Sequence, residues 1–205
     1  MQPSASITCR DWPCEDMNHE AFQVPAISCD PISIRLVLIA EAPPEDASEG
    51  LWAGPAALHA QTTLLAFASA GLQAGSTKEL LARGVYLTTA VKCAKRNYGI
   101  APACVSRCST LLEQELDLFT SVRGYLLMGD VAIRAFNALA RRRTGKRVIP
   151  AGSTYKVRDG VFWYGDARVY PSYLQAGKSY FIEQSKRRMI AEDIAAALAW
   201  CGVGA

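Results

Sequence analysis

The chain has 205 residues, a length that suits one ordinary domain. Half of the residues are hydrophobic and a fifth are charged, which excludes a disordered chain. No apolar run approaches the roughly 20 residues needed to span a bilayer, and the N-terminus lacks an apolar signal core, so we expect a cytoplasmic protein without a membrane partner. A net charge of +3 does not by itself indicate a nucleic-acid partner.

The first half of the chain begins with an irregular stretch and then alternates. Prolines punctuate residues 1–30, where no periodicity emerges. Residues 32–40 form a nearly continuous β-branched, apolar run, typical of a strand buried on both faces. Residues 55–72 are predicted to form a helix, with proline at the start and glycine near the end. Residues 84–93 are predicted to be the next strand and its exit.

The second half continues the alternation. A helical apolar stripe runs through residues 102–119, residues 122–129 resemble a third strand, and a helix begins at Asp130. A further strand ends within residues 167–174, before a last helix with one apolar face. Alternating strands and helices predict βαβ units, a parallel sheet and helices on both of its faces.

Several polar side chains are predicted at strand ends. Glu41, Thr89 and Tyr170 each lie where a predicted strand finishes. Ligands of such sheets bind outside the carboxyl ends of the strands, so these residues could converge on one crevice. The basic runs 141–147 and 186–188 are either phosphate-binding patches or solvated helix residues.

The chain contains seven cysteines, a high number for a reducing compartment, where disulfides rarely persist. Metal or cluster ligation is therefore a hypothesis to consider. Cys104 and Cys108 are one helical turn apart and share a helix face. The alternative for this pair is two small buried residues.

A series of short motifs occurs in a fixed order: AEAPPED, LWAGPAALHAQTTLL, YLTTAVKC, the Cys108 helix, YLLMGDVAIRAF, YKVRDG and VYPSYL before the last helix. Together they resemble the uracil-DNA glycosylase superfamily over residues 32–200, and most closely its iron–sulfur branch, often called family 4. The resemblance implies one domain over residues 1–205, a three-layer α/β/α sandwich with a central four-stranded parallel sheet.

The resemblance also implies an activity. Such enzymes extrude a damaged or deaminated, uracil-like base from DNA and hydrolyse its N-glycosidic bond. We therefore expect a monomeric DNA glycosylase whose partner is single- or double-stranded DNA. One alternative is a non-catalytic nucleic-acid or nucleotide-binding protein of the same fold. Another is an unrelated α/β enzyme that acts on small molecules through Glu41.

The first motif carries the predicted catalytic carboxylate. By resemblance Glu41 positions water, and Ala42 and Pro43 beside it contact the base. The alternative is a strand-end or helix-cap acid. Pro44 stands where the family has a glycine, which removes one backbone N–H.

Three further positions depart from the family pattern. Trp52 occupies the place of the ring that stacks on the base, with plain core packing as its alternative. Thr89 replaces an asparagine that reads the base edge, and a hydroxyl cannot reproduce an amide's paired hydrogen bonds. Tyr170 replaces a histidine that donates to the leaving base, and a phenol changes the proton chemistry. Both histidines, His19 and His59, lie in other segments.

The later motifs imply DNA contacts. By resemblance Lys156, Arg158 and Ser172 contact the DNA backbone, and Leu174 inserts into the duplex. The alternative for Leu174 is a hydrophobic residue that covers the entry to the last helix.

The same branch of the superfamily holds a 4Fe–4S cluster with four cysteines. Cys93 and Cys108 match the last two ligands, and Cys9 and Cys14 supply the first pair at a spacing of C-x4-C instead of C-x2-C. Whether Cys29 or Cys104 is a ligand stays open. The cluster is expected to tie the N-terminal segment to the sheet.

Overall fold

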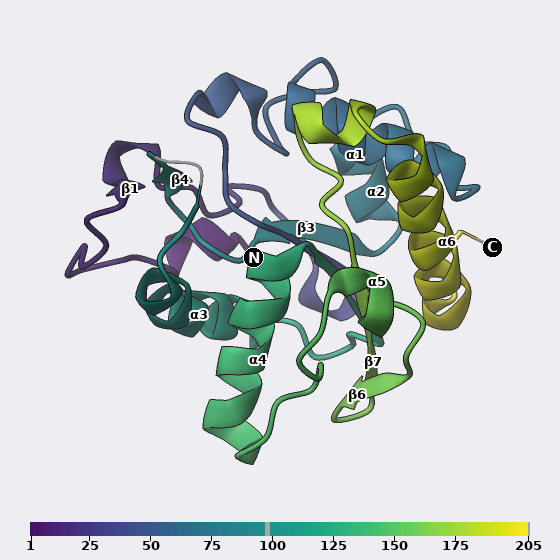
Figure 1. The fold of residues 1–205 in the computed structure, drawn as a ribbon. Helices are drawn as coiled ribbons and strands as arrows, with labels where there is room; N and C mark the ends of the chain where they lie inside the picture. Colours follow the sequence, from purple (N-terminus) through teal and green to yellow (C-terminus); the bar gives the residue numbers. More distant parts are fainter. Residues whose placement is uncertain (97–98, 205) are drawn as a thin grey trace.

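A twisted five-stranded sheet forms the middle layer of the molecule (Figure 1). The computed structural model describes residues 1–96 and 99–204. The strand order is β3-β2-β5-β7-β6, and the four strands β3, β2, β5 and β7 are parallel. The strands are β2 (Leu36–Ala40), β3 (Val85–Thr89), β5 (Gly124–Met128), β6 (Phe162–Tyr164) and β7 (Ala167–Ser172).

The predicted four-stranded parallel sheet is confirmed for these four strands, and the structure adds a fifth. Strand β6 pairs antiparallel with β7 at the edge of the sheet. Gly165 and Asp166 join them in a tight turn, where Gly165 has a φ of 57°. A glycine with positive φ suits a two-residue hairpin turn between antiparallel strands. The sequence pattern did not distinguish β6 from the approach to β7.

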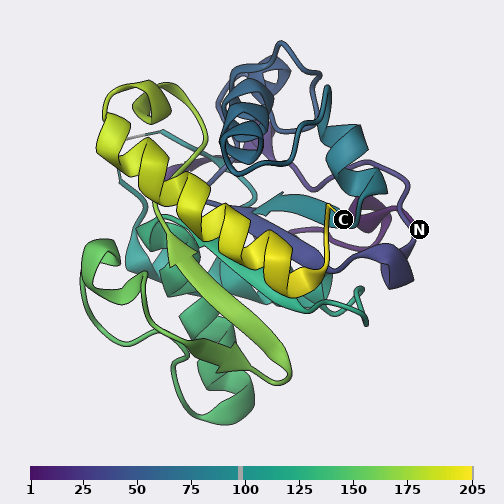
Figure 2. The same cartoon turned by 90° about the vertical axis from the view of Figure 1, so that its right-hand side faces the viewer.

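Helices cover both faces of the sheet (Figures 1 and 2). Helices α3 and α4 pack together on one face, and α1 and α6 pack together on the other, which makes the predicted α/β/α sandwich. Within residues 1–96 and 99–204, no helix combines the length and apolar character needed to cross a membrane. The helices are α1 (Leu58–Ser69), α2 (Thr77–Ala82), α3 (Pro102–Leu116), α4 (Asp130–Thr144), α5 (Thr154–Val157) and α6 (Gln184–Cys201).

Helix α2 was not among the elements predicted from the sequence. Its N-cap Ser76 accepts a hydrogen bond from the backbone N–H of Glu79, and the Glu79 carboxylate accepts one from Gly75 N. This S-x-x-E arrangement resembles a capping box and was visible in the sequence.

The N-terminal segment is irregular, as predicted, and lies against the exit of β3. Strand β1 (Met17–Asn18) pairs antiparallel with β4 (Ala94–Lys95). The backbone N–H of Gln23 donates to the carbonyl of Lys92 over 2.7 Å. These main-chain bonds hold residues far apart in sequence side by side.

A buried ionic network fixes the end of β3 against α3. Lys92 and Glu115 form an ion pair with no exposed side-chain area. The Glu115 carboxylate also accepts from the Tyr86 hydroxyl (2.6 Å) and from Thr88 Oγ1 (2.9 Å), while Lys92 Nζ donates to the carbonyl of Thr89 (2.6 Å). Each charge in the network is therefore hydrogen-bonded, which is the condition for tolerating charges in a protein interior.

The packing of α6 on the sheet gives a stability prediction. A Cβ atom at Gly124 would lie 2.6 Å from Cys201 Sγ and 3.3 Å from Leu36 Cδ1. Gly124→Ala is expected to lower the free energy of unfolding by about 1–3 kcal/mol, as overpacking typically does. Urea denaturation of this variant and of Gly124→Ala/Cys201→Ala is the measurement. The second substitution should recover part of the loss, and simple additivity of the two effects would contradict the steric explanation.

Candidate active site

Strands β2 and β3 end together at the carboxyl edge of the sheet. Ala40 is paired with Thr89, and Glu41 follows Ala40 directly. The chain then turns away through Pro43 and Pro44. The first polar side chain after a buried strand is thus placed where ligands of parallel sheets bind.

Two adjoining cavities lie at this edge. The Trp52 cavity, of about 260 Å³, is lined by Trp52 and Thr89. The Glu41 cavity, of about 320 Å³, is lined by Glu41, Ala42 and Leu174. Both cavities share the wall residues Pro43, Pro44 and His59. The structure therefore brings Glu41 and the four residues predicted to bind the base to one compact site, with Leu174 beside it.

Lys95 of β4 orients the Glu41 carboxylate. Lys95 Nζ lies 2.9 Å from Glu41 Oε1, and the Glu41 side chain is 18% exposed. An ionised carboxylate has about four acceptor positions, so one ammonium leaves others for a water molecule. Lys95 thus holds one carboxylate oxygen of Glu41, while the side chain still lines the cavity.

The Trp52 ring is fixed as a wall of its cavity. Its Nε1–H donates to the carbonyl of Leu87 over 3.1 Å, and its centroid is 6.3 Å from that of Tyr86. The ring is half-buried and packs at the border of the core around β2 and β3. A ring anchored in this manner is a rigid surface for a planar ligand.

The structure does not bring Tyr170 to this site. Tyr170 is paired with Leu126 inside the sheet, because β7 continues to Ser172. Its ring is buried in the core under α6, with Arg168 Cζ 4.9 Å from the ring centroid, and it lines neither cavity. Burial raises the pKa of the phenol. Convergence of Tyr170 with Glu41 is thus not found.

Arg158 and Ser172 belong to a network of ion pairs and hydrogen bonds that joins α5, β7 and α6. Arg158 Nη2 lies 2.8 Å from Asp193 Oδ1 and 2.9 Å from Glu192 Oε2, and Ser172 Oγ donates to Asp193 Oδ2 over 2.5 Å. The Arg158 side chain is 10% exposed. These contacts give Arg158 of the YKVRDG motif a structural role. Lys156 is exposed, and DNA contacts by Lys156, Arg158 and Ser172 stay predictions.

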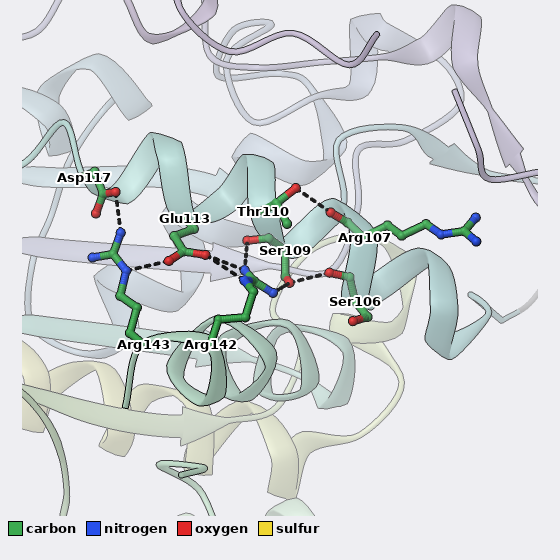
Figure 3. Close-up of polar contacts among 8 residues, drawn as sticks. All are labelled: Ser106, Arg107, Ser109, Thr110, Glu113, Asp117, Arg142 and Arg143. Atoms are coloured by element: carbon green, nitrogen blue, oxygen red, sulfur yellow. Dashed lines mark hydrogen bonds and ion pairs between the residues drawn. The ribbon is translucent and has the colours of Figure 1, made fainter. Parts of the chain in front are cut away.

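Two arginines of the first basic run, Arg142 and Arg143, stabilise helix packing (Figure 3). Arg142 contacts Glu113 (2.6 Å) and donates to Ser109 Oγ (2.8 Å), and Arg143 contacts Glu113 (2.5 Å) and Asp117. These pairs tie α4 to α3. Because α4 starts at the carboxyl edge of β5 and runs back across the sheet, its arginine-rich end lies away from the two cavities.

The second basic run lies closer to the site. Residues 186–188 are in the first turns of α6, which packs against the 3₁₀ turn Lys178–Phe181. Lys178 lines the Glu41 cavity. Lys186 pairs with Glu183 over 2.8 Å, and the pair is half-exposed. Lys178 therefore provides a positive charge at the Glu41 cavity.

Five cysteines gather around a third cavity, of about 570 Å³, on the α3 side of the N-terminal segment. They are Cys9, Cys14, Cys93, Cys104 and Cys108. Burial raises the pKa of the Cys93 thiol, which the sulfurs of Cys108, Cys9 and Cys14 raise further, to about 12. Burial also raises the pKa of Cys104 and of Cys108, again with contributions from neighbouring thiols. Three of the five thiols that line this cavity thus favour the protonated form.

The donor set of this cysteine cavity fits an iron–sulfur cluster. In the described part of the chain, no three His, Cys, Asp or Glu side chains are arranged to hold a single metal ion. A four-iron cluster is larger than an ion, and thiolates hold it from several sides. Cys9, Cys14, Cys93 and Cys108, the four predicted ligands, all face the same cavity, and so does Cys104. Cys29 lines a different cavity.

Lys95 beside Glu41 and two polar residues that line the Trp52 cavity were not predicted as site residues from the sequence. Gln23, from the N-terminal segment, and His59, from the first turn of α1, both line the Trp52 cavity. Neither belongs to a motif at a strand end. No local pattern pointed to Gln23, and His59 was noted only as one of the chain's histidines.

The fold and the site define a class of protein: a three-layer α/β/α domain with a carboxylate and an aromatic wall at the carboxyl edge of its sheet. The model of the Uracil DNA glycosylase superfamily matches residues 27–195, and the chain belongs to this superfamily. The match spans Glu41, Trp52 and Thr89. Comparison with curated proteins found no significant match. Membership supports a DNA-glycosylase-like role in general and DNA as a partner.

Proposed function

We propose that this protein is a DNA glycosylase that hydrolyses the N-glycosidic bond of a flipped, damaged or deaminated base. The observation that carries the proposal is that Glu41 and Trp52 line adjoining cavities in a chain of this superfamily. Extrusion of a base requires unstacking of a few kcal/mol, least for a mismatched or single-stranded base.

Each cavity has its own part in the proposed reaction. The base enters the Trp52 cavity, where stacking on the indole contributes about 1–3 kcal/mol. The sugar lies at the wall shared with the Glu41 cavity, so the carboxylate can orient a water toward the anomeric carbon. Its negative charge also stabilises the cationic sugar as the bond breaks.

We further propose that the cysteine cavity holds a 4Fe–4S cluster, which supports assignment to the family 4 branch. Cys9, Cys14, Cys93 and Cys108 would be the ligands. The cluster would have a structural role, because it connects the N-terminal segment to the exit of β3 and to α3. No step of the hydrolysis requires it.

The cluster gives a prediction on metal content. Anaerobically purified protein is expected to be brown and to contain about four irons and four sulfides per chain. Cys108→Ser should lose most of the iron and become less stable, because the group links separate segments. Cys104→Ser and Cys29→Ser should keep the iron. The control is Cys201→Ala, since Cys201 ends α6 and its thiol faces Gly124 of β5. A folded, colourless and iron-free parent would refute the cluster.

A base-excision assay tests the proposed function. Single- and double-stranded oligonucleotides carrying uracil, hypoxanthine, xanthine or a thymine mismatch are incubated with the protein, and abasic sites are revealed by alkaline cleavage. Release of any of these bases supports a glycosylase.

The second candidate is a non-catalytic DNA-binding protein of the same fold. It is favoured by the position of Tyr170, which leaves the site without the family's donor at that place. Salt-dependent DNA binding without release of any base would support this candidate.

A further inference from the structure

Two unpaired polar atoms point to how the Trp52 cavity selects its ligand. In the described part of the chain, Gln23 Nε2 and His59 Nδ1 are buried and have no hydrogen-bond partner. Both side chains line the Trp52 cavity. Buried polar groups are almost always hydrogen-bonded, so unpaired atoms on residues that line a cavity are expected to bond a water or a polar ligand there.

Gln23 supplies an amide beside Thr89. Its backbone is fixed by the bond to Lys92 O, so the side chain is held at the exit of β3. Thr88 also lines the cavity, but its hydroxyl already donates to Glu115 and accepts from Lys92 Nζ. Thr89 offers one hydroxyl oxygen that both donates and accepts, whereas a glutamine amide presents a donor and an acceptor on two separate atoms. Gln23 therefore brings the chemistry that the threonine lacks.

His59 stands at the wall between the two cavities. It lines both of them, and the other residues of this wall, Pro43 and Pro44, have no side-chain donor. Its Nε2 points toward Gly177, where an added Cβ would lie 3.4 Å from it. Burial lowers the pKa of the imidazole, with Glu49 opposing and Lys95 reinforcing this effect. The neutral ring has one N–H donor and one acceptor.

We propose that Gln23 and His59 are the base-contacting pair of this site, and that they select bases with a carbonyl oxygen over the corresponding amines. The inference rests on the proposed function. Gln23 Nε2 donates to the carbonyl oxygen on the edge of the flipped base. His59, at the wall where the glycosidic bond lies, hydrogen-bonds the base as it departs with the bonding electron pair.

Binding measurements test the role of Gln23. The probes are labelled single-stranded oligonucleotides with a 2′-fluorinated nucleoside, which resists cleavage, and they carry uracil or cytosine, or hypoxanthine or adenine. Each pair differs by a carbonyl against an amine. The parent should bind the carbonyl member more tightly than the amine member. In Gln23→Met the ratio of the two affinities should fall about tenfold, as expected for the loss of one hydrogen bond. Gln61→Met, an exposed change on α1, should keep it.

Single-turnover excision tests His59. His59→Leu should slow release of the preferred base by about 100-fold with little change in affinity, as loss of one preorganised donor does. His59→Asn, which keeps an N–H, should recover part of the rate. Circular dichroism and melting curves confirm that each variant is folded.

The two levels of the proposal fail in different ways. A parent that releases no base refutes the proposed function, while the carbonyl preference in binding still decides the role of Gln23. Equal affinity of the parent for both members of each pair overturns the inference. An unchanged preference in Gln23→Met, or an unchanged rate in His59→Leu, also overturns it.

Discussion

Glu41→Gln is expected to lower the single-turnover rate of base excision by about 10²–10⁴-fold, the usual contribution of a positioned acid or base. The amide keeps the size of the side chain and can still accept from Lys95, but it has no charge to stabilise a cationic sugar. Little stability should be lost, since the Lys95 partner is 38% exposed and such pairs are worth about 0–1 kcal/mol.

The control for Glu41→Gln is Asp166→Asn, which also removes one negative charge. Asp166 is exposed in the turn between β6 and β7, at the edge of the sheet opposite the cavities. Both variants should bind DNA at least as well as the parent, because each loses a charge that repels phosphate. A parental excision rate in Glu41→Gln would remove Glu41 from the reaction.

Lys92→Met is expected to lower the free energy of unfolding by about 3–5 kcal/mol, because it leaves the buried Glu115 carboxylate without its counter-ion. The hydroxyls of Tyr86 and Thr88 would still donate to that carboxylate but cannot neutralise it. Urea denaturation of the parent and the variant measures the difference.

A double variant shows whether the ion pair or the packing accounts for the loss of stability. Lys92→Met/Glu115→Leu should be more stable than the sum of the two single losses predicts, since removing both charges leaves neither unpaired. Lys186→Met, which breaks the half-exposed pair with Glu183, should change stability by less than about 1 kcal/mol. Additive losses would argue against an ionic origin.

The sequence predicted those parts of the site that follow directly from buried strands. The apolar runs of β2 and β3 end at Glu41 and Thr89, so their place at the sheet edge follows from local pattern. The predicted position of Tyr170 at the end of a strand was wrong, because β7 continues to Ser172. In a strand, alternate residues face opposite sides, and Tyr170 faces α6 while Val169 faces α3 and α4.

Contacts between residues distant in sequence could not be predicted from local sequence patterns. Arg158 could be read as a free cation only while its partner Asp193, distant in sequence, was unknown. Gln23 is part of the site because main-chain bonds draw an irregular segment to Lys92. Such pairings depend on tertiary structure and leave no periodic signal in the sequence.

The two-residue strand β4 couples two cavities of the molecule. Cys93, immediately before β4, lines the cysteine cavity, and Lys95 within β4 holds the Glu41 carboxylate. Strand β1 of the N-terminal segment pairs with β4, so the position of that segment bears on both cavities through one short strand. Docking of the N-terminal segment on β4 is therefore expected to influence how Lys95 holds Glu41.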